Sequence, residues 1–573
     1  MGGPFAWGDG TASAPTPVSF PQLVPSLPHA TLGVCSGGWA ELCVPGHGCI
    51  MVCAPVFKQL LGGALQCASP SPPPRSHSSS RAGHVASLPL KWSLWAPALL
   101  LHTESSARRV PLSQTPARSL LPLRNQCPSV KFCGDSRQPF PNLVTCVTWN
   151  PGSARQQSPP FEVELSEIIM VKNEVNYALN NLSSWMKDEG VDKSLVTQLD
   201  RAFIRKEPYG VVLIIGPWNY PLQLILVPLV GAIAAGNCVI IKPSEISSST
   251  EKLLAETLPS YLDKDCFAVV TGGPAEMTKL LENKFDYIFF TGSPQVGKIV
   301  MAAAAKHLTP LTLELGGKNP CFVADESNLQ NVANRLVWGR CFNAGQTCIA
   351  PDYVLCSAET QEKLLPALRH AITQFFGPEP RESPDFARII SDKQFQRIRA
   401  LLGSGRVAIG GQTDERERYI APTVLADVQP SEPAMQEEIF GPVLPIVTVP
   451  NVDEAIAFIN SRERPLAVYV FASDSKLVRR VLERTSSGGF GANDPIMQMT
   501  LISLPFGGIG NSGLGSYHGK FSFDTFSHHR ACLLRSMGLE PMNSLRYPPY
   551  SERKMGLVLS IFRIKRTGTC TLL

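Results

Sequence analysis

A single thiol stands out in the second half of the chain. Cys348 ends the run Phe-Asn-Ala-Gly-Gln-Thr-Cys at residues 342–348, whose small and polar residues favour a turn. A cysteine presented by such a turn can attack a carbonyl carbon and later leave again as a thiolate. A lone cysteine is also an ordinary small core residue, so its interpretation depends on the residues that accompany it.

Two further side chains have the chemistry to act with this thiol. Glu314 interrupts the apolar run 311–315. Apolar surroundings raise the pKa of a carboxyl group, which suits a general base near neutral pH, although a structural ion pair with Lys318 would explain the same residue. Asn219 follows the apolar run 209–216, where it is either a turn former or a hydrogen-bond donor to a ligand.

The pattern of residues 161–313 predicts the elements that position these side chains. Apolar, β-branched runs bounded by glycine alternate with segments of helical spacing. The expected strands are 209–216, 238–241, 267–270 and 287–290, and the expected helices are 162–187, 222–235 and 249–258. This alternation predicts an α/β fold with a Rossmann-like parallel sheet, which places ligands at the carboxyl ends of its strands.

Several residues at these strand ends could hold a nucleotide. Gly292, Ser293 and Gly297 lie at a strand-to-helix turn, where backbone N–H groups can meet a pyrophosphate. Their spacing is not G-x-G-x-x-G, so the glycines alone leave dinucleotide binding open. Lys242 and Glu245 follow an earlier strand, where they either hydrogen-bond a ribose or form a solvated surface pair.

The composition is that of a globular chain with an unusual start. The 573 residues are 44% hydrophobic and 17% charged, and no apolar run is long enough to span a bilayer. Residues 1–160 hold 23 of the 50 prolines, and 11 of the 52 Lys and Arg against 4 of the 47 Asp and Glu. The remainder is therefore slightly acidic, which argues against nucleic-acid binding, and the Pro- and Ser-rich start predicts disorder. No cysteine and histidine spacing matches a metal site.

The carboxyl terminus carries a candidate lipidation motif. Cys570 begins a C-a-a-X box whose final Leu favours geranylgeranyl, although Thr571 fits its position weakly. Arg563, Lys565 and Arg566 lie just upstream and supply a second, electrostatic membrane signal. We therefore expect a prenyl anchor at Cys570.

Five linked motifs in this chain resemble those of the aldehyde dehydrogenase superfamily in order and spacing. They are residues 217–221, 242–245, 313–318, 342–348 and 438–442. The resemblance covers residues 161–573 and extends to the class 3 branch and its membrane-associated subfamily B. It implies NAD(P)-dependent oxidation of medium- to long-chain aliphatic, and also aromatic, aldehydes to carboxylic acids.

The resemblance also implies a role for each candidate residue. Cys348 would be the nucleophile, the Asn219 side chain and the Cys348 backbone N–H would form the oxyanion hole, and Glu314 would activate the water that hydrolyses the thioester. Cofactor contacts would be Lys242 and Glu245 at the adenosine ribose, Gly292, Ser293 and Gly297 near the pyrophosphate, and Glu438 and Phe440 on the nicotinamide side. The resemblance further implies a homodimer on the cytoplasmic face of a membrane or a lipid droplet, with NAD or NADP as cofactor.

The family pattern divides the chain and leaves its start unexplained. The expected parts are an NAD(P)-binding domain at 161–313 with part of a bridging element near 187–206, a catalytic domain at 314–511, a bridging and oligomerisation segment at 512–545, and a basic, prenylated tail at 546–573. Residues 1–160 do not resemble the family's N-terminal helices. A catalytically impaired, membrane-tethered protein is therefore the alternative. A thiol hydrolase that uses Cys348 is a third hypothesis, although no histidine is identifiable as its base.

Overall fold

The structure is a computed structural model that describes residues 33–35, 39–44, 47–52 and 158–562, in two compact units, residues 1–54 and 55–573. In the first unit, β1 (Gly33–Cys35), β2 (Trp39–Val44) and β3 (His47–Val52) form an antiparallel sheet in that order. This sheet was not anticipated from the sequence. Apart from this sheet and residues 158–160, the segment 1–160 that was predicted to be disordered lies outside the described residues.

The larger unit contains the predicted parallel sheet. Its strand order is β20-β10-β9-β6-β7-β8, and all neighbouring pairs are parallel except β20 with β10. The strands are β6 (Val211–Ile215), β7 (Cys238–Lys242), β8 (Phe267–Val269), β9 (Tyr287–Gly292), β10 (Leu311–Leu315) and β20 (Gly513–Leu514). Leu213, Ile214 and Val239 are fully buried, as expected for strands covered on both faces.

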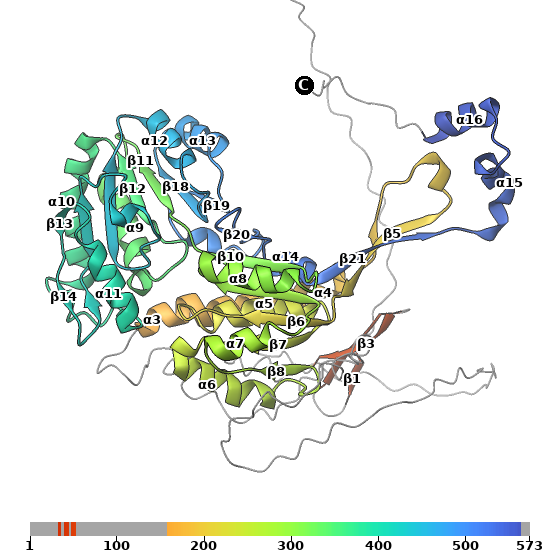
Figure 1. Ribbon diagram of the computed structural model, residues 1–573, viewed down its shortest axis with the longest axis horizontal. Helices are drawn as coiled ribbons and strands as arrows, with labels where there is room; N and C mark the ends of the chain where they lie inside the picture. The colour runs from red at the N-terminus through yellow and green to blue at the C-terminus, as the bar shows by residue number, and fades with distance from the viewer. Residues whose placement is uncertain (1–32, 36–38, 45–46, 53–157, 563–573) are drawn as a thin grey trace, which may run out of the picture. The chain divides into compact units, whose positions relative to one another are not determined.

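Helices accompany this sheet as the βα alternation predicts (Figure 1). They are α5 (Gln223–Ala234), α6 (Ser248–Thr257), α7 (Pro274–Leu280) and α8 (Pro294–Ala305). The predicted helix at 162–187 is present as α3 (Pro160–Val163), a π-helical turn (Glu164–Ile168) and α4 (Ile169–Trp185), and α4 packs on α5. One π-helical turn inside an otherwise regular helix shifts the face that the following residues present.

A second sheet of seven strands follows in the chain, in the order β13-β16-β17-β12-β11-β18-β19. Its strands are β11 (Pro320–Val323), β12 (Tyr353–Cys356), β13 (Arg406–Ile409), β16 (Thr423–Ala426), β17 (Val443–Thr448), β18 (Ala467–Phe471) and β19 (Gly489–Ala492). Its helices are α9 (Leu329–Cys341), α10 (Ala358–Phe376), α11 (Asp392–Leu401), α12 (Val452–Asn460) and α13 (Ser475–Arg484).

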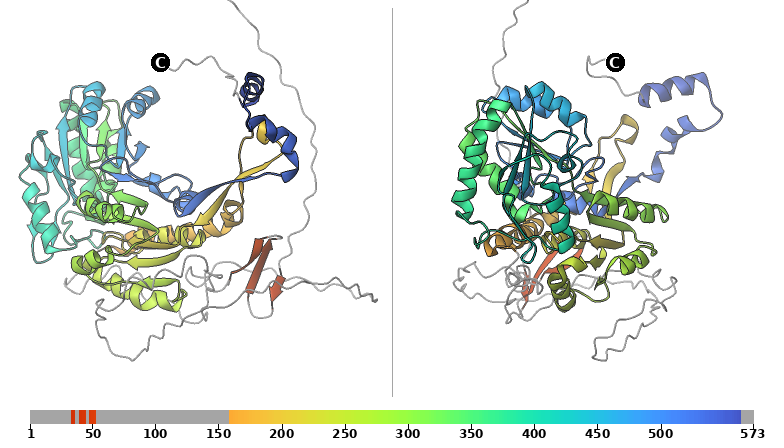
Figure 2. Two further views of the ribbon diagram at one scale, coloured as in Figure 1. Left: turned by 45° about the vertical axis from the view of Figure 1, so that its right-hand side comes forward. Right: turned by 60° about the vertical axis from the view of Figure 1, so that its left-hand side comes forward.

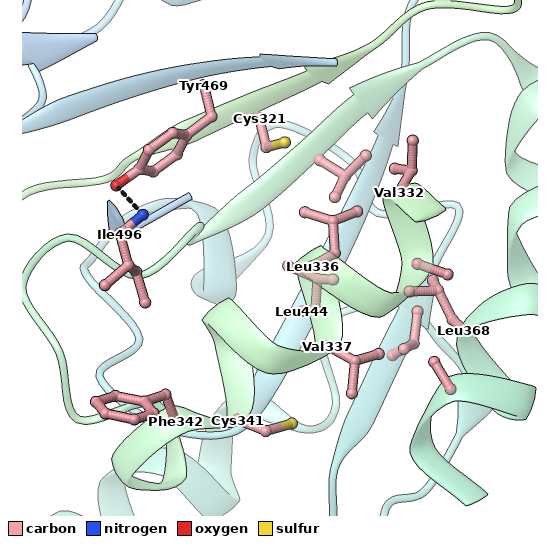
Figure 3. Packing of buried hydrophobic residues seen from close by; sticks show 14 of the residues in the cluster. Cys321, Val332, Leu336, Val337, Cys341, Phe342, Leu368, Leu444, Tyr469 and Ile496 are labelled. Atoms are coloured by element: carbon pink, nitrogen blue, oxygen red, sulfur yellow. Dashed lines mark hydrogen bonds between the residues drawn. The ribbon is translucent and has the colours of Figure 1, made fainter. Parts of the chain in front are cut away.

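The core beside this second sheet fixes α9, the helix that leads to the Cys348 turn. Leu336 and Val337 on α9 pack with Cys341 and Phe342 at its end (Figure 3). Buried apolar contacts of this kind hold a helix in place more firmly than its intrinsic propensity does. The residues that follow α9 therefore start from a rigid point.

Helix α10 departs from the sequence-based expectation. The sequence predicted a helix at 361–376 with Pro366 tolerable only in the first turn. The helix begins at Ala358 instead, and Pro366 lies inside it. The buried face of α10, which includes Leu364 and Leu368, outweighs the backbone hydrogen bond that a proline cannot donate.

A separate three-stranded antiparallel sheet has the order β21-β5-β4, with strands β4 (Glu189–Gly190), β5 (Arg201–Pro208) and β21 (Ser527–Leu534). Figure 2 shows β5 and β21 running away from the two large sheets toward α15 (Glu540–Asn543) and α16 (Glu552–Phe562). A further sheet consists of the antiparallel pair β14 (Thr413–Asp414) and β15 (Tyr419–Ile420).

These elements adjust two of the expected boundaries. The division between residues 313 and 314 falls inside β10, so it cuts a strand of the first sheet. Within the expected bridging segment 512–545, β20 pairs with β10, and α14 (Gly519–Thr525) packs on α4 and α5. The chain thus returns to the first sheet before it reaches β21. The sequence missed α14 and β21 because dense glycine before them hides any period.

Candidate active site

Cys348 is presented by a turn with an unusual backbone. After α9 ends, Asn343 has φ 53°, Ala344 has φ 51° and Gly345 has φ 74°, three left-handed residues in a row. A side chain at Gly345 would overlap the carbonyl oxygen of Gly441, so only glycine fits there. The turn brings Cys348 out of the core to a half-buried position.

One asparagine fixes the backbone on either side of the thiol. The Asn319 side-chain amide donates to the carbonyl oxygens of Cys348 at 2.8 Å and Ala350 at 3.0 Å. Its side-chain oxygen accepts the N–H of Ala467, the first residue of β18, at 2.9 Å. Asn319 is buried, and these bonds tie the backbone at Cys348 to the second sheet.

Asn219 lies beside the same turn, as the sequence predicted for a residue at the end of β6. Its side-chain amide donates to the carbonyl oxygen of Gln346 at 3.0 Å. Its own carbonyl oxygen accepts the Asn343 side-chain amide at 2.9 Å. The Asn219 amide is therefore hydrogen-bonded to the turn that carries the thiol, at a residue two positions before Cys348.

Glu314 is a buried carboxyl group without a partner. Its side chain is 3% exposed, and neither oxygen has a hydrogen bond within the described part of the chain. The ion pair with Lys318 that the sequence left open does not form, because Lys318 pairs with Asp352 at 2.5 Å. Burial raises the pKa of Glu314 well above its usual value.

The thiol and the carboxyl groups influence one another. Burial first, and the charges of Glu438 and Glu314 next, raise the pKa of the Cys348 thiol to about 12, while the N–H groups of Cys348 and Ile349 act in the opposite direction. The structure thus brings Cys348, Glu314 and Glu438 into one electrostatic environment. A thiol of this pKa is protonated near neutral pH, so its reaction requires a base.

A cavity opens beside the thiol. Its lining is largely apolar with a few polar groups. The lining residues are Ser166, Tyr220, Gln223, Leu224, Thr347, Cys348, Ile349, Met499, Phe506, Tyr517 and His518. Tyr220 and Thr347 share a hydrogen bond of 2.5 Å between their hydroxyl oxygens. Burial lowers the pKa of His518 to about 4, so this imidazole is neutral at physiological pH.

The carboxyl edge of the first sheet collects the candidate cofactor residues. Asn219 follows β6, Lys242 ends β7, and Glu314 lies one residue before the end of β10. Gly292 ends β9, and Ser293 caps α8 by accepting the Val296 N–H at 3.4 Å. Gly297 lies in the first turn of α8 against Leu315. Parallel strands bring these ends to one edge, where open α/β sheets bind ligands.

Lys242 and Glu245 are not simply a solvated pair. Lys242 is 3% exposed, and burial lowers its pKa, whereas Glu245 is exposed. Their charged atoms lie 3.8 Å apart, and the Lys242 ammonium also donates to the carbonyl oxygen of Pro243. A buried ammonium and an exposed carboxylate at the end of β7 can both contact a hydroxyl-bearing ligand at the sheet edge.

Glu438 and Phe440 lie before β17 and face the first sheet. A side chain at Gly316, just after β10, would overlap the Glu438 carboxylate. Burial raises the pKa of Glu438 to about 8, with a smaller contribution from Asp352. Phe440 has φ 52° and meets Trp218 edge-on, with ring centroids 5.3 Å apart.

The polar groups at this edge fit a nicotinamide nucleotide. Thr291 Oγ1, both Glu314 oxygens and Glu438 Oε1 are buried without hydrogen-bond partners within the described residues. Unsatisfied buried acceptors and hydroxyls are costly unless a ligand or water completes them. A molecule with ribose hydroxyls and a carboxamide supplies the missing donors.

Sequence reasoning missed three residues that shape the site: Glu162, Asn319 and Asn343. The Glu162 carboxylate accepts the Asn343 N–H at 2.9 Å, across 181 positions of the chain. Asn343 was visible only as part of the turn motif, and Asn319 follows the glycine pair after β10 without any pattern of its own. Only tertiary packing reveals these contacts.

A parallel sheet whose polar carboxyl edge carries the unpartnered Glu314 and lies beside a half-buried thiol defines an α/β protein with a nucleotide-type site. Comparison with known proteins agrees with this class. The model of the aldehyde dehydrogenase family matches residues 153–532. Aldehyde dehydrogenase family 3 member B1 of Homo sapiens is 68% identical over 413 residues, covering 72% of this chain and 88% of that protein. Member B2 of Mus musculus is 67% identical over 398 residues, covering 70% and 83%.

Solved structures show the same fold. The substrate-bound AldH of Staphylococcus aureus is 42% identical with a TM-score of 0.69, covering 71% of this chain and 88% of that one. The Mycobacterium tuberculosis aldehyde dehydrogenase complexed with NAD+ is 28% identical with a TM-score of 0.62, covering 69% and 81%.

The chain belongs to the aldehyde dehydrogenase family, as the five sequence motifs predicted. Its relatives at 65–68% identity are members of subfamily B of the family's class 3. It is an enzyme that oxidises aldehydes with NAD or NADP. In the described part of the chain, the helices are too short or too polar to cross a bilayer, and no group of three metal-binding side chains occurs.

Proposed function

We propose that the protein oxidises medium- to long-chain aliphatic, and also aromatic, aldehydes through Cys348, with Glu314 as the base. One observation carries this assignment: the half-buried Cys348 and the buried, unpartnered Glu314 share one electrostatic environment at the carboxyl edge of the first sheet. A thiol and a base at a nucleotide site are the groups that aldehyde oxidation requires. The Asn219 amide and the Cys348 N–H are the proposed oxyanion donors.

The chemistry follows from these positions. Glu314 takes the proton of the Cys348 thiol and releases it to water. The Cys348 sulfur then bonds to the aldehyde carbon, giving a thiohemiacetal whose oxyanion is held by Asn219 and the Cys348 N–H. A bound NAD or NADP would supply the acceptor for the hydride of that carbon. A thioester on Cys348 remains. Glu314 takes a proton from a water that attacks the thioester, and the carboxylic acid leaves while the thiol is restored.

Residues at the sheet edge are the proposed cofactor contacts. Lys242 and Glu245 bind the adenosine ribose, and the helix start at Ser293, flanked by Gly292 and Gly297, meets the pyrophosphate. Glu438 and Phe440 form the border of the cofactor site on its nicotinamide side. Support comes from the buried Lys242 and from the unpartnered Glu438 Oε1.

The substrate class rests on the cavity lining. Leu224, Ile349, Met499 and Phe506 offer an apolar wall next to Cys348. An alkyl or aryl group buried there gains about 25 cal/mol for each Å² removed from water. The affinity for aldehydes should therefore increase with chain length until the cavity is filled.

Absorbance of the reduced cofactor tests the proposed function directly. Purified protein with octanal and NAD or NADP should reduce the cofactor, and Cys348→Ser should abolish the reaction. Ester cleavage without cofactor reduction would instead favour the thiol hydrolase. Inactivity in both assays would favour the catalytically impaired, membrane-tethered protein.

We further propose a homodimer formed through the β21 edge. Among the described strands, β21 has a neighbour on one side only in the sheet β21-β5-β4, and Leu533 and Leu534 on it are each 55% exposed. An open edge with exposed leucines is suited to pairing with a second copy. Light scattering should give a dimer mass, and Leu533→Asp should lower it to that of a monomer.

The membrane proposal concerns the carboxyl terminus. Cys570 and the basic residues before it lie outside the described residues, so the prenyl anchor on the cytoplasmic face of a membrane or lipid droplet remains a prediction. In α16, Met555, Leu559 and Phe562 are more than half exposed, which supports contact with lipid. Cys570→Ser should move the protein from the membrane fraction to the soluble fraction of cells; unchanged fractionation would remove the anchor.

A further inference from the structure

The turn before Cys348 needs support from outside itself. Asn343 and Ala344 are left-handed residues with side chains, and such backbone persists only where surrounding contacts hold it. Both are buried. The source of that support determines how firmly the turn presents Cys348.

The support comes from the first described helix, far away in sequence. The Glu162 carboxylate on α3 accepts the backbone N–H of Asn343 at 2.9 Å. Ser158, just before α3, donates its hydroxyl to the side-chain oxygen of Asn343 at 3.4 Å. The hydroxyl of Ser166 donates to the Glu162 carbonyl at 2.7 Å, inside the π-helical turn. Glu162 thus supplies the acceptor for the Asn343 N–H, to which the Cys348 turn itself offers no acceptor in the described residues.

The contact continues to the proposed oxyanion donor. The side-chain amide of Asn343 donates to the Asn219 carbonyl oxygen at 2.9 Å, and the Asn219 amide donates to the Gln346 carbonyl oxygen at 3.0 Å. The Gln346 N–H in turn donates to the Asn343 carbonyl oxygen at 3.1 Å. Glu162, Asn343 and Asn219 therefore form one hydrogen-bonded series that ends at the proposed oxyanion hole.

We propose that Glu162 is a positioning residue for aldehyde oxidation, holding Asn343 so that the Asn219 amide and the Cys348 N–H converge on the oxyanion. The inference rests on the proposed roles of Asn219 and Cys348. The positioning role requires an acceptor oxygen at the reach of a glutamate side chain, because the hydrogen bond joins that oxygen to the backbone N–H of Asn343. Glu162 touches no reacting atom.

Substitutions at Glu162 separate acceptor geometry from charge. Glu162→Ala removes the acceptor, Glu162→Asp withdraws it by one methylene, and Glu162→Gln retains an oxygen at the same reach. Glu164 is a matched control in the π-helical turn that follows α3, because it is exposed and forms an ion pair with Lys172 at 3.6 Å. The assay measures kcat per Cys348 thiol that a covalent label titrates, together with the KM for octanal.

We expect Glu162→Ala and Glu162→Asp to lower kcat per titrated thiol by about 10- to 100-fold, the range for a displaced oxyanion donor. The KM for octanal should change less than about threefold, because Glu162 does not line the substrate cavity. Glu162→Gln should stay within about fivefold of the wild type, and Glu164→Ala should equal it.

A double-mutant cycle with Asn219→Ala distinguishes positioning from a general structural role. If Glu162 acts through Asn219, Glu162→Ala should cost far less in the Asn219→Ala background than in the wild type. Equal losses in both backgrounds, wild-type kcat in Glu162→Ala, or activity in Glu162→Asp but not Glu162→Gln would each overturn the inference. Should Glu162→Ala fail to fold, the Asp and Gln variants decide. An inactive wild type would instead overturn the proposed function.

Discussion

The Asn319 side chain joins the Cys348 carbonyl to the start of β18, with 2.8 Å from its amide to that oxygen and 2.9 Å from the Ala467 N–H to its own oxygen. The backbone of the proposed nucleophile is therefore fixed to β18 of the second sheet. The residue has no reactive chemistry of its own. Its side chain is the geometric link between a strand and the thiol.

Asn319→Ala should weaken both stability and catalysis. Removing the side chain leaves buried partners without hydrogen bonds, each of which costs about 1–3 kcal/mol. We expect unfolding in urea to show a loss of about 2–4 kcal/mol and kcat to fall at least about tenfold. Asn334→Ala, on the partly exposed side of α9, is the control and should leave both quantities near wild type. An unchanged kcat in Asn319→Ala would show that the thiol needs no such link.

Gly316→Ala should impair cofactor binding rather than folding alone. The added methyl group would overlap the Glu438 carboxylate, which must move away from the nicotinamide side. We expect the KM for NAD to rise at least about tenfold, since a displacement of about 1 Å is costly at a bound reactant. Gly403→Ala is the matched control, because nothing lies within 4 Å of the added carbon. A KM for NAD equal in both variants would contradict the placement of Glu438.

The sequence predicted the first sheet well because its signals are local. Apolar runs such as 211–215 end in glycine or polar turns, and each became a buried parallel strand. The motif around Cys348 located the turn that presents this thiol for the same reason: the left-handed backbone at Gly345 requires a residue type that can be read directly.

What the sequence could not predict depends on contacts between distant segments. Glu162 looks like any polar residue of an amphipathic helix until the fold brings Asn343 to it. Lys318 follows Glu314 closely in sequence and suggested an ion pair, yet the strand geometry gives Lys318 to Asp352 instead. Pro366 suggested a helix boundary, but burial of the neighbouring leucines decides the matter. Local rules cannot rank such competing partners.

Glu167→Gln should remove part of the pH dependence of stability. Glu167 accepts the N–H groups of Leu222 at 2.7 Å and Gln223 at 2.9 Å, and burial raises its pKa from 4.5 to about 7. Between these values the folded state holds a proton that the unfolded state has lost, so the free energy of unfolding falls as pH rises and levels off above about pH 7.

Urea unfolding at about pH 5 and pH 8 measures this effect. Relative to the wild type, Glu167→Gln should gain about 2–3 kcal/mol between the two values, because an amide does not ionise. Glu167→Gln and wild-type stabilities that run parallel across this window would show that Glu167 titrates normally.

Glu438→Gln should make the thiol of Cys348 more reactive at alkaline pH. The Cys348 pKa is raised to about 12 by burial first and by the Glu438 charge next, so removing that charge lowers it. Glu438 itself has a pKa of about 8 and is mostly neutral below it. The alkylation rate of Cys348 by iodoacetamide, followed by mass spectrometry, should therefore match the wild type near pH 7. Above pH 8 it should exceed the wild type at least about threefold.

Glu437→Gln is the control, because Glu437 is exposed and pairs with Arg397 at 3.5 Å. A rate increase in Glu437→Gln as large as in Glu438→Gln would mean that general surface charge, rather than the half-buried Glu438, sets the reactivity of the thiol.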